Sequence, residues 1–460
     1  MNKWAVALAA DSKVTISGMN ASKAYDTANK VFTLSKFHPV GVMIFGNAEF
    51  MGYPWETIIK LYRKQKGRAS ESHVARWADD FLAFLRKFGR IDAHHKSMNL
   101  KGICGSWFGQ ALAMAQERAS ERSIAPGTEA YTKEVLTAVN HLIQHCHSAG
   151  EWASAKQRKV IAEAHVQDIV DVIGDYFSDF RDEALGARAV ELAGSALFTN
   201  RMSPQSSGFV VAGFGDDEYF PTVVQYNIDG YVGNRIKVVQ EITSDVSRSM
   251  QSTVRAFAQK EMVQTFMEGI DPGLYQQMLH SFSGIMEQNC LAVLDSYGMK
   301  KHKTNAVKEK ISSSLELAVQ GMAKGIQSIK SDKYINPAIR MVGLLPKDEL
   351  AHLAESLVAL TSLKRRVSSD AETVGGPIDV ALISKGDGFV WIKRKHYFPR
   401  ELNVAFFGNY MADIHNGANA NEDTGTAIGT GRSAKPVAAS RSRGRKANGG
   451  AGGQRPRRSR

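Results

Sequence analysis

Cysteine is scarce in this sequence, which has only Cys104, Cys146 and Cys290 among its 460 residues. Because the three are far apart and odd in number, the sequence does not predict a disulfide framework, and a reducing compartment is expected. Long hydrophobic runs are missing as well. No stretch has membrane length, and the apolar opening that starts at Trp4 meets a charge at Asp11, too early for a signal peptide. We therefore expect a cytoplasmic protein without membrane contact.

Acidic residues are absent from the end of the chain, residues 431–460, which hold ten Lys or Arg. The net charge of +12 therefore leaves only +2 for the rest of the chain. Because this Gly-, Ala-, Ser- and Arg-rich segment has almost nothing to bury, residues 411–460 are expected to form a disordered basic tail. The tail could contact phosphates weakly and without sequence preference, bind an acidic partner, or only keep the protein dissolved. It has no aromatic residue on which bases could stack.

Segments with the pattern of β-strands stand at the beginning, middle and end of the chain. They cover residues 4–16, 39–46, 208–215, 222–232 and 378–392. An Asp-Gly turn at Asp229-Gly230 is predicted to divide the fourth segment into two short strands, and a turn around Gly386 makes the last segment the clearest hairpin.

Helical periodicity fills the space between these strands. Apolar residues recur at steps of three and four in 74–88 and in 307–329. Pro346 begins a third pattern of this kind, with acidic residues in its first turn. The order of elements predicts an α+β protein in which helices cover a sheet core. Long helical insertions are expected at about 70–200 and 245–365.

Three sequence blocks, taken in order, resemble the proteasome β-subunits and the bacterial peptidase HslV. They are AADSKVT with NKVF and GVMIFGNAEF, then VVAGFGDDEYFPTVVQYNIDG, then VGGPIDVALISKGDGFVWIKRK. The resemblance spans about residues 11 to 398. It implies the four-layer αββα sandwich of N-terminal-nucleophile hydrolases for residues 1–410. The insertions exceed what compact members of the family have, which suggests a larger bacterial branch.

The same resemblance implies a threonine peptidase that works in a homo-oligomeric ring on peptides or unfolded proteins, without a cofactor or a metal. A separate ATPase unfoldase is a possible partner. It would have to be another chain, since no G-x-x-x-x-G-K-[ST] motif occurs here.

In the family a threonine at the mature N-terminus supplies the nucleophile, and its own α-amine acts as the general base. Carried over by position, Asp11 matches the orienting aspartate and Lys30 the lysine that keeps the site positive. Lys13 falls on a second basic position. Gly46 or Asn47 matches the turn whose backbone N–H stabilises the oxyanion. Taken singly, each has a plainer interpretation, as a strand end, a surface lysine or a turn glycine.

The nucleophile of the family has no counterpart in the sequence. Residues Asn2-Lys3 are expected at the turn of the first hairpin, and about six or seven residues, or ~20 Å of strand, would have to precede them. No Ser, Thr or Cys stands at that place. Two explanations stay open. The strand and its threonine are encoded upstream of Met1, or the strand has been lost and the protein is a catalytically inactive scaffold that binds partners.

Histidine and cysteine gather once, in HLIQHCHSAG, where His141 and His145 are four residues apart beside Cys146 and His147. Two histidines at that spacing on a helix could bind a metal ion. No third ligand follows at a fixed distance. We therefore expect a solvated polar helix end rather than a metal site.

Overall fold

The computed structural model describes residues 1–17, 22–180, 182–247, 250–296, 301–368, 374–396, 398–399, 401–405 and 408. The expected tail, 411–460, lies outside the described residues. Residues 1–397 form one compact unit. It is a mixed α/β fold with antiparallel sheets. Within the described ranges, no helix has both the length and the apolar character needed to cross a membrane.

A five-stranded antiparallel sheet contains most of the predicted strand segments, in the order β10-β9-β8-β5-β4. Its strands are β4 (Val31–Thr33), β5 (Val40–Gly46), β8 (Ser207–Gly213), β9 (Thr222–Val232) and β10 (Arg235–Asp245). The central strands β5 and β8 are buried along nearly their whole length. Apolar residues fill both of their faces, because both faces of this sheet are covered.

A three-stranded sheet of β1 (Ala5–Ala10), β11 (Asp379–Ser384) and β12 (Gly388–Lys393) packs on the five-stranded sheet. Side chains alternate between the two faces of a strand. Accordingly, Val6 and Leu8 of β1 share a core with Met43 and Val210 of the five-stranded sheet. The alternate residues Ala5 and Ala7 face the other way, into a separate core.

Helices cover the outer faces of both sheets. Helices α1 (Trp55–Lys66) and α2 (Val74–Arg86) lie on the five-stranded sheet, where Trp77 and Phe81 meet Phe209 of β8. Helix α12 (Lys347–Val367) lies on the three-stranded sheet, where Leu350 packs with Ala5. The predicted apolar face of 74–88 is confirmed, since Val74, Trp77, Ala78, Phe81, Leu82, Leu85 and Phe88 are all buried. Thus α2 and α12, which lie inside the two predicted insertions, pack directly on the sheets.

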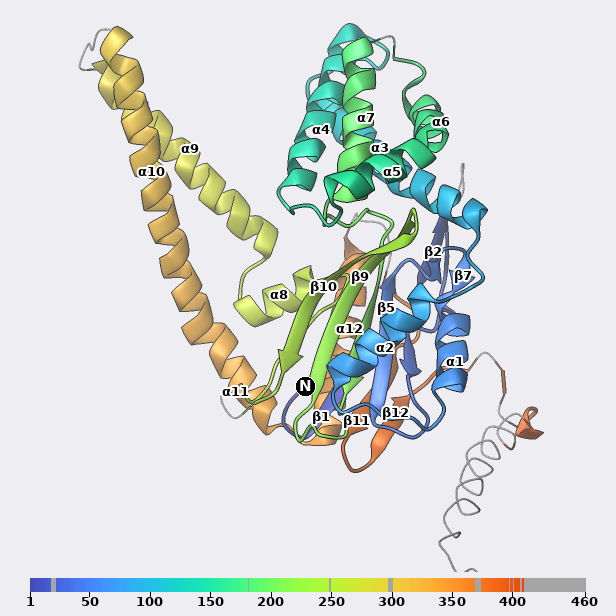
Figure 1. Cartoon of the computed structure of the whole chain (residues 1–460). Coiled ribbons are helices and arrows are strands. Elements are labelled where there is room, and N and C mark those ends of the chain that lie inside the picture. The colour runs from blue at the N-terminus through green and yellow to red at the C-terminus, as the bar shows by residue number, and fades with distance from the viewer. Residues whose placement is uncertain are drawn as a thin grey trace, which may run out of the picture. The chain divides into compact units, whose positions relative to one another are not determined.

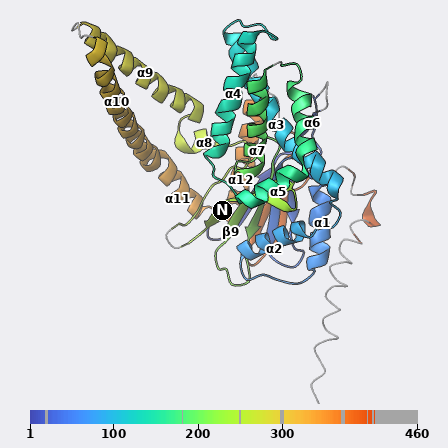
Figure 2. The same cartoon turned by 45° about the horizontal axis from the view of Figure 1, so that its top comes forward.

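A helical bundle with its own core stands beside one end of the sheets (Figures 1 and 2). Its members are α3 (Ala93–Glu121), α4 (Glu129–His147), α5 (Ala155–Ala164), α6 (Val166–Phe177) and α7 (Glu183–Phe198). Phe108, Leu142 and Leu192 lie in its interior, and Val232 at the end of β9 belongs to the same cluster. The bundle is therefore joined to the sheet through apolar packing as well as through the chain.

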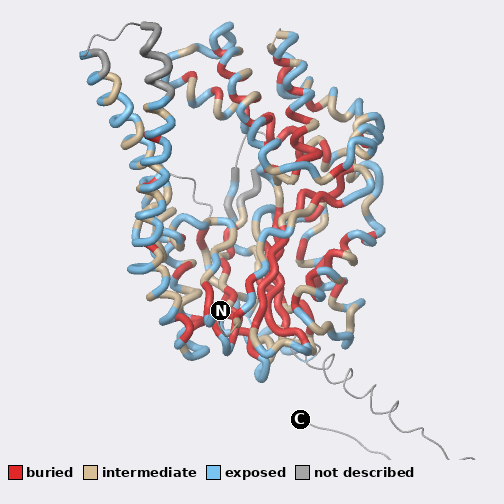
Figure 3. The backbone as a smooth tube through the Cα atoms, turned by 60° about the vertical axis from the view of Figure 1, so that its left-hand side comes forward, coloured by how far each residue is buried: buried red, intermediate tan, exposed pale blue. Residues whose placement is uncertain are grey.

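Two long helices, α9 (Pro272–Ser296) and α10 (Lys301–Lys330), form a second helical feature, which stands to the left of the bundle and of the sheets in Figure 1. Short elements connect them to the sheets: α8 (Glu261–Glu268), the π-helical turn η1 (Ser331–Ile335) and α11 (Asn336–Leu344). In Figure 3 buried residues concentrate in the sheets and the bundle, whereas α9 and α10 are mainly exposed or intermediate. Two small hairpins complete the fold, β2 (Val14–Ser17) with β3 (Ser22–Tyr25), and β6 (Glu49–Phe50) with β7 (Tyr53–Pro54).

The predicted Asp-Gly turn at 229–230 is wrong. Strand β9 runs straight through Asp229 and Gly230, and the chain turns at Gly233-Asn234 before β10. Gly230 has a φ of 87°, which opens a bulge in the pairing with β10 rather than a turn. The local pattern was typical of a turn, but the buried carboxylate of Asp229 has a partner on β10 that keeps it inside the sheet.

Candidate functional site

The sequence-predicted pair Asp11 and Lys30 meets in space, although 19 residues separate the two in the chain. Lys30 Nζ donates to Asp11 Oδ1 at 2.8 Å. The Asp11 side chain is 12% exposed and that of Lys30 22%, so the pair is largely withdrawn from water. The second carboxylate oxygen, Oδ2, accepts from the backbone N–H groups of Lys13 and Gly375, both at 3.1 Å. Three donors therefore fix the orientation of this one carboxylate.

Two segments position the pair, the end of β1 and the residues before β4. Asp11 follows the last residue of β1, where the strand ends and the chain turns toward β2. Lys30 precedes β4, and its carbonyl oxygen accepts from the backbone N–H of Ile44 in β5 at 2.8 Å. The link between the two segments is direct, because Ala28 N–H donates to the carbonyl of Ser12 at 2.9 Å. The site thus lies where the two sheets meet at the end of β1.

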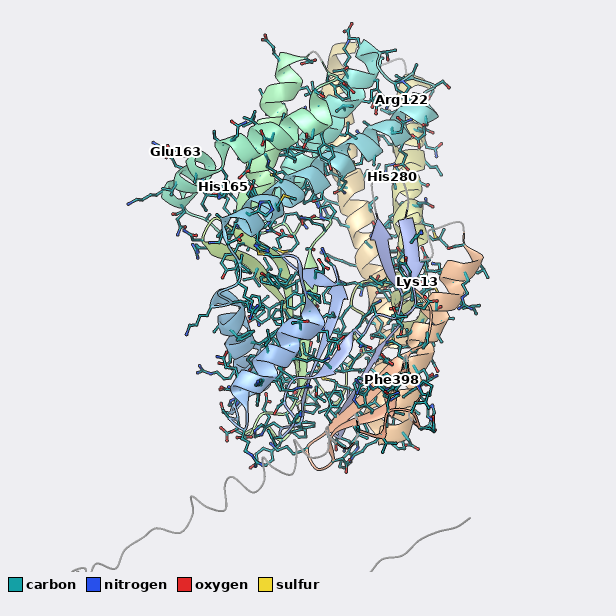
Figure 4. The ribbon with its side chains drawn as sticks, turned by 90° about the vertical axis from the view of Figure 1, so that its right-hand side faces the viewer. Lys13, Arg122, Glu163, His165, His280 and Phe398 are labelled. Carbon is teal, nitrogen blue, oxygen red and sulfur yellow. The ribbon has the colours of Figure 1, made fainter. Side chains whose placement is uncertain are left out.

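Lys13, the second predicted basic residue, lies next to the same carboxylate at the start of β2 (Figure 4). Its backbone N–H binds Asp11, and the residue as a whole is only 7% exposed. The structure therefore places Asp11, the Lys13 backbone and Lys30 next to one another, and their assignment to catalysis stays a prediction.

Gly46 and Asn47 lie at the end of β5. They follow Ile44, whose backbone N–H donates to the Lys30 carbonyl, by two and three residues. Gly46 has a φ of 77°, a backbone conformation that favours glycine. A Cβ there would stand 2.4 Å from the carbonyl oxygen of Ser206. The Asn47 side chain accepts from the backbone N–H of Glu49 at 3.0 Å and closes the following turn. Both residues are exposed, so the backbone N–H groups of this turn are near solvent.

The first residues of the chain form the beginning of a hairpin with β1. Asn2 N–H donates to the carbonyl of Ala5 at 3.0 Å, so Lys3 and Trp4 make a two-residue turn, one residue later than predicted. On its other side, Met1 exchanges two backbone hydrogen bonds with Thr253, at 2.8 and 2.9 Å. Met1 and Asn2 are therefore held between β1 and the segment around Thr253.

Strand β1 is an edge strand in the described part of the chain. Its one paired edge faces β11, from Ala5–Ser384 to Ala10–Asp379. The other edge faces the side on which Met1 and Asn2 lie. In the register of the Asn2–Ala5 pair, the position opposite Asp11 would be that of the fifth residue before Met1. That estimate is slightly shorter than the six or seven residues expected from the sequence.

A pocket of about 340 Å³ opens beside Asn47, between the end of β5 and the start of α3. Its other sides include Phe50, Met98 and Gln205. Neither Asp11 nor Lys30 lines it. The pocket is therefore next to the turn that follows β5 and does not contain the charged pair.

The histidines singled out in the sequence lie on the exposed end of α4. His141, His145 and His147 are exposed, whereas Cys146 points into the bundle and is buried. His147 Nε2 lies 3.1 Å from Ser195 Oγ on α7, which fixes the ring against the neighbouring helix. Within the described ranges no group of three or more His, Cys, Asp or Glu side chains is arranged to hold a metal ion.

Sequence reasoning missed the contribution of residues 375–377. Gly375 N–H binds the Asp11 carboxylate, and its carbonyl accepts from Ser12 N–H at 3.2 Å. The buried hydroxyl of Ser12 donates to the carbonyl of Pro377. The Gly-Gly-Pro sequence before the last hairpin was visible, but a loop that comes back to Asp11 over more than 360 residues has no local pattern.

No protein-family model matches this chain, and neither a curated protein nor a solved structure was found to match it.

Proposed function

We propose that this chain is a proteasome-like threonine peptidase subunit, built on the four-layer αββα sandwich of N-terminal-nucleophile hydrolases. In this proposal Asp11 and Lys30 are the charged pair of its active site, and the protein acts in the cytoplasm within a homo-oligomeric ring. The observation that carries the proposal is the position of Asp11. Its carboxylate lies at the end of β1, bound to Lys30 and to two backbone N–H groups.

The order of the packed elements supports the sandwich. Helices α1 and α2 pack on the five-stranded sheet, this sheet packs on the three-stranded one, and α12 packs on the outer side of that. The two sheets share a core that includes Leu8, Met43, Val210 and Ile383. This succession of helix, sheet, sheet and helix supports the four-layer sandwich that we propose.

The start of the chain supports a place for the missing nucleophile. A strand added before Met1 would continue the hairpin begun by Asn2 and run along the open edge of β1. Directly opposed residues of antiparallel strands put their side chains on the same face. A threonine about five residues before Met1 would therefore share a face with Asp11. The added strand would pair backbone groups along an edge that is otherwise open.

The chemistry of such a site follows from its charges. The threonine hydroxyl would attack the peptide carbonyl while its proton passes to the α-amine of the same residue. The Lys30 ammonium disfavours protonation of a nearby amine and so keeps this base neutral. Asp11 balances the charge of Lys30 and orients the Lys30 side chain. A backbone N–H in the Gly46-Asn47 turn would stabilise the oxyanion. Its collapse would break the C–N bond, the leaving amine would take the proton held by the α-amine, and water would then hydrolyse the ester of the acyl-enzyme.

A second function has support in the sequence as given. The 460 residues hold no threonine at the required place. In the described part of the chain, no Ser, Thr or Cys side chain is hydrogen-bonded to Asp11 or Lys30. A catalytically inactive, proteasome-like scaffold that binds partners through its helical parts is therefore the alternative.

The peptidase and the scaffold predict different results when a first strand is added to the chain, since only the peptidase should gain activity. We would prepare the 460-residue chain and a series in which about four to seven residues precede Met1, each starting with threonine and continuing with apolar residues. A shift of one residue turns every side chain to the other face, so only one or two lengths should hydrolyse fluorogenic peptides. The unextended chain should be inactive. Absence of activity at every length, with folding intact, would favour the scaffold.

The active length then allows a matched pair of substitutions. Lys30→Ala should lower kcat by at least about 100-fold, because the α-amine loses the cation that keeps it neutral. Lys23→Ala, on β3 and exposed, should leave kcat unchanged. Circular dichroism of both variants establishes that they are folded before their kcat values are compared. Turnover that survives Lys30→Ala would place the chemistry elsewhere.

A further inference from the structure

The long helices α9 and α10 carry large apolar side chains that nothing in the described ranges covers. Leu274, Met278 and Ile285 of α9 are 52%, 50% and 58% exposed, and Ile329 of α10 is 52% exposed. Figures 1 and 2 both show the two helices standing clear of the α3–α7 bundle. Single apolar side chains on a surface are ordinary, but a set along one pair of helices indicates an interaction surface.

Three of the large exposed apolar residues of α9 lie on one strip, whereas Met286 and Val293, which are also exposed, lie on the side of Tyr275. An α-helix turns by about 100° per residue, so Leu274, Met278, Ile285 and Ala292 fall within about 40° of one another. Tyr275 marks the side of α9 that packs on α10, since it is buried and its hydroxyl approaches the carbonyl of Ala323. The apolar strip is therefore turned by roughly a quarter turn from the contact between the two helices.

Helix α10 has a matching strip of apolar and small residues. Ala318, Gly325 and Ile329 lie within about 40° of one another, and all three are exposed. Leu315 is buried and marks the side toward α9. This strip too is about a quarter turn from the helix contact, in the same sense as on α9. Because α9 and α10 run in opposite directions, both strips lie on the same flat side of the pair.

We call this side the apolar face; it consists of Leu274, Met278, Ile285, Ala292, Ala318, Gly325 and Ile329. No residue of it carries a charge. Polar residues lie on the opposite side, where His280 (Figure 4) and Glu287 of α9 accompany Glu316 and Gln320 of α10. The two sides of the helix pair therefore differ in polarity, although Leu317 of α10 is exposed outside the apolar face. The apolar face can meet an identical face without repulsion between like charges.

We propose that the apolar face binds the same face of a second copy of this chain, so that two helix pairs form a four-helix bundle about a two-fold axis. Open space over Gly325, where a Cβ would meet no atom within 4 Å, leaves room for a close approach of the second copy. This two-fold contact would be distinct from any head-to-tail ring contact. It does not rest on the proposed peptidase activity.

The size of the apolar face agrees with a stable dimer. Helix α9 has 25 residues, which at 1.5 Å per residue gives about 37 Å. Two helices side by side are about 20 Å wide. The side of the helix pair that carries the apolar face therefore has an outline of roughly 700 Å², room for a contact of standard size, in which each partner buries ~800 Å² of accessible surface.

Light scattering of the full 460-residue chain tests the proposal. The Ile285→Glu variant should have half the mass of the unsubstituted protein at the same micromolar concentration. Burying a carboxylate in an apolar interface should weaken the two-fold contact by at least about 100-fold. Gln320→Glu adds the same charge on the opposite side of the helix pair and should leave the mass unchanged.

A second variant on the other helix makes the result independent of one substitution. Ala318→Glu should also halve the mass, while circular dichroism of all variants keeps the helix content of the parent protein. A monomeric parent protein at micromolar concentration would overturn the proposal. So would an unchanged mass of folded Ile285→Glu and Ala318→Glu variants, or an equal loss of mass in Gln320→Glu.

Discussion

Lys237 Nζ lies 2.9 Å from Asp229 Oδ2, and the two side chains are 1% and 0% exposed. Lys237 also donates to the carbonyl oxygens of Ala196 and Arg201, both at 2.6 Å. Asp229 accepts from the backbone N–H of Ser203, at 3.0 and 3.1 Å to its two oxygens, and from the Ser203 hydroxyl at 2.6 Å. This buried pair ties β9 and β10 to the end of α7 and the chain that follows it.

Removing one member of this pair should be costly. Asp229→Ala leaves a buried ammonium without its counter-charge, so we expect the free energy of unfolding to fall by about 3–5 kcal/mol. Urea denaturation followed by circular dichroism measures this change. The double variant Asp229→Ala, Lys237→Met should lose less than the sum of the two single variants, because it leaves no unpaired charge. Additive losses would contradict the coupling.

The three thiols should differ in reactivity. Burial raises the pKa of Cys104 to about 12 and that of Cys146 to about 11. The thiolate is the reactive form, so both should resist iodoacetamide in the native protein at pH 8. Cys290 is partly exposed on α9 and should be alkylated first. Mass spectrometry of peptides after limited alkylation checks the order, and all three should react in urea. Fast native labelling of Cys104 would show that the bundle core opens readily.

Gly46 should not tolerate a side chain. Gly46→Ala has to adopt a φ of 77° and would also place its Cβ 2.4 Å from the Ser206 carbonyl oxygen. We expect it to lose about 2–4 kcal/mol of stability. Gly67 is the matched control, since its φ is 57° but no atom lies within 4 Å of an added Cβ. Gly67→Ala should lose less than Gly46→Ala, because it has the backbone strain of a positive φ without the contact to a carbonyl oxygen. Equal losses in the two denaturation curves would mean that the chain at Gly46 can move away from Ser206.

Asp168 should contribute stability that disappears in acid. Burial alone raises the pKa of this carboxyl, but hydrogen bonds from Ser97 and His165 outweigh burial and hold the pKa below its usual 3.8. Because the pKa of Asp168 is lower in the folded than in the unfolded state, its ionised form stabilises the fold above pH 3.8. This stabilisation is lost as the pH falls through the folded-state pKa. Asp168→Asn should therefore cost about 1 kcal/mol at pH 6, allowing for its partial exposure. The difference should shrink toward pH 2; a constant difference in urea midpoints would contradict the assignment.

Much of the secondary structure followed from local pattern. The apolar positions of 74–88 predicted a helix and the face that it buries, and Pro346 with its acidic neighbours predicted the start of α12. The last hairpin was found as predicted, with β11 and β12 paired around the turn that contains Gly386. These predictions succeed because periodicity records which side chains must leave water, and a helix or strand of that period follows.

The candidate site was accessible in part. Asp11 and Lys30 could be selected because the order of the three sequence blocks suggested one mechanism, and the folded chain places their charged atoms 2.8 Å apart. Their assignment to catalysis stays a prediction. The loop at Gly375 could not be selected, because its link to Asp11 joins opposite ends of the sequence.

The sequence by itself determined helix faces such as that of 74–88 and the buried strands, since each depends only on the spacing of residue types along one element. Only the tertiary structure decided which of these elements meet. Lys237 has the appearance of a surface lysine in the sequence, and Asp229-Gly230 that of a turn, yet each is kept in the core by the other. A buried charge is tolerable only with its partner in place. That partner becomes visible only when the sheet has brought the two strands side by side.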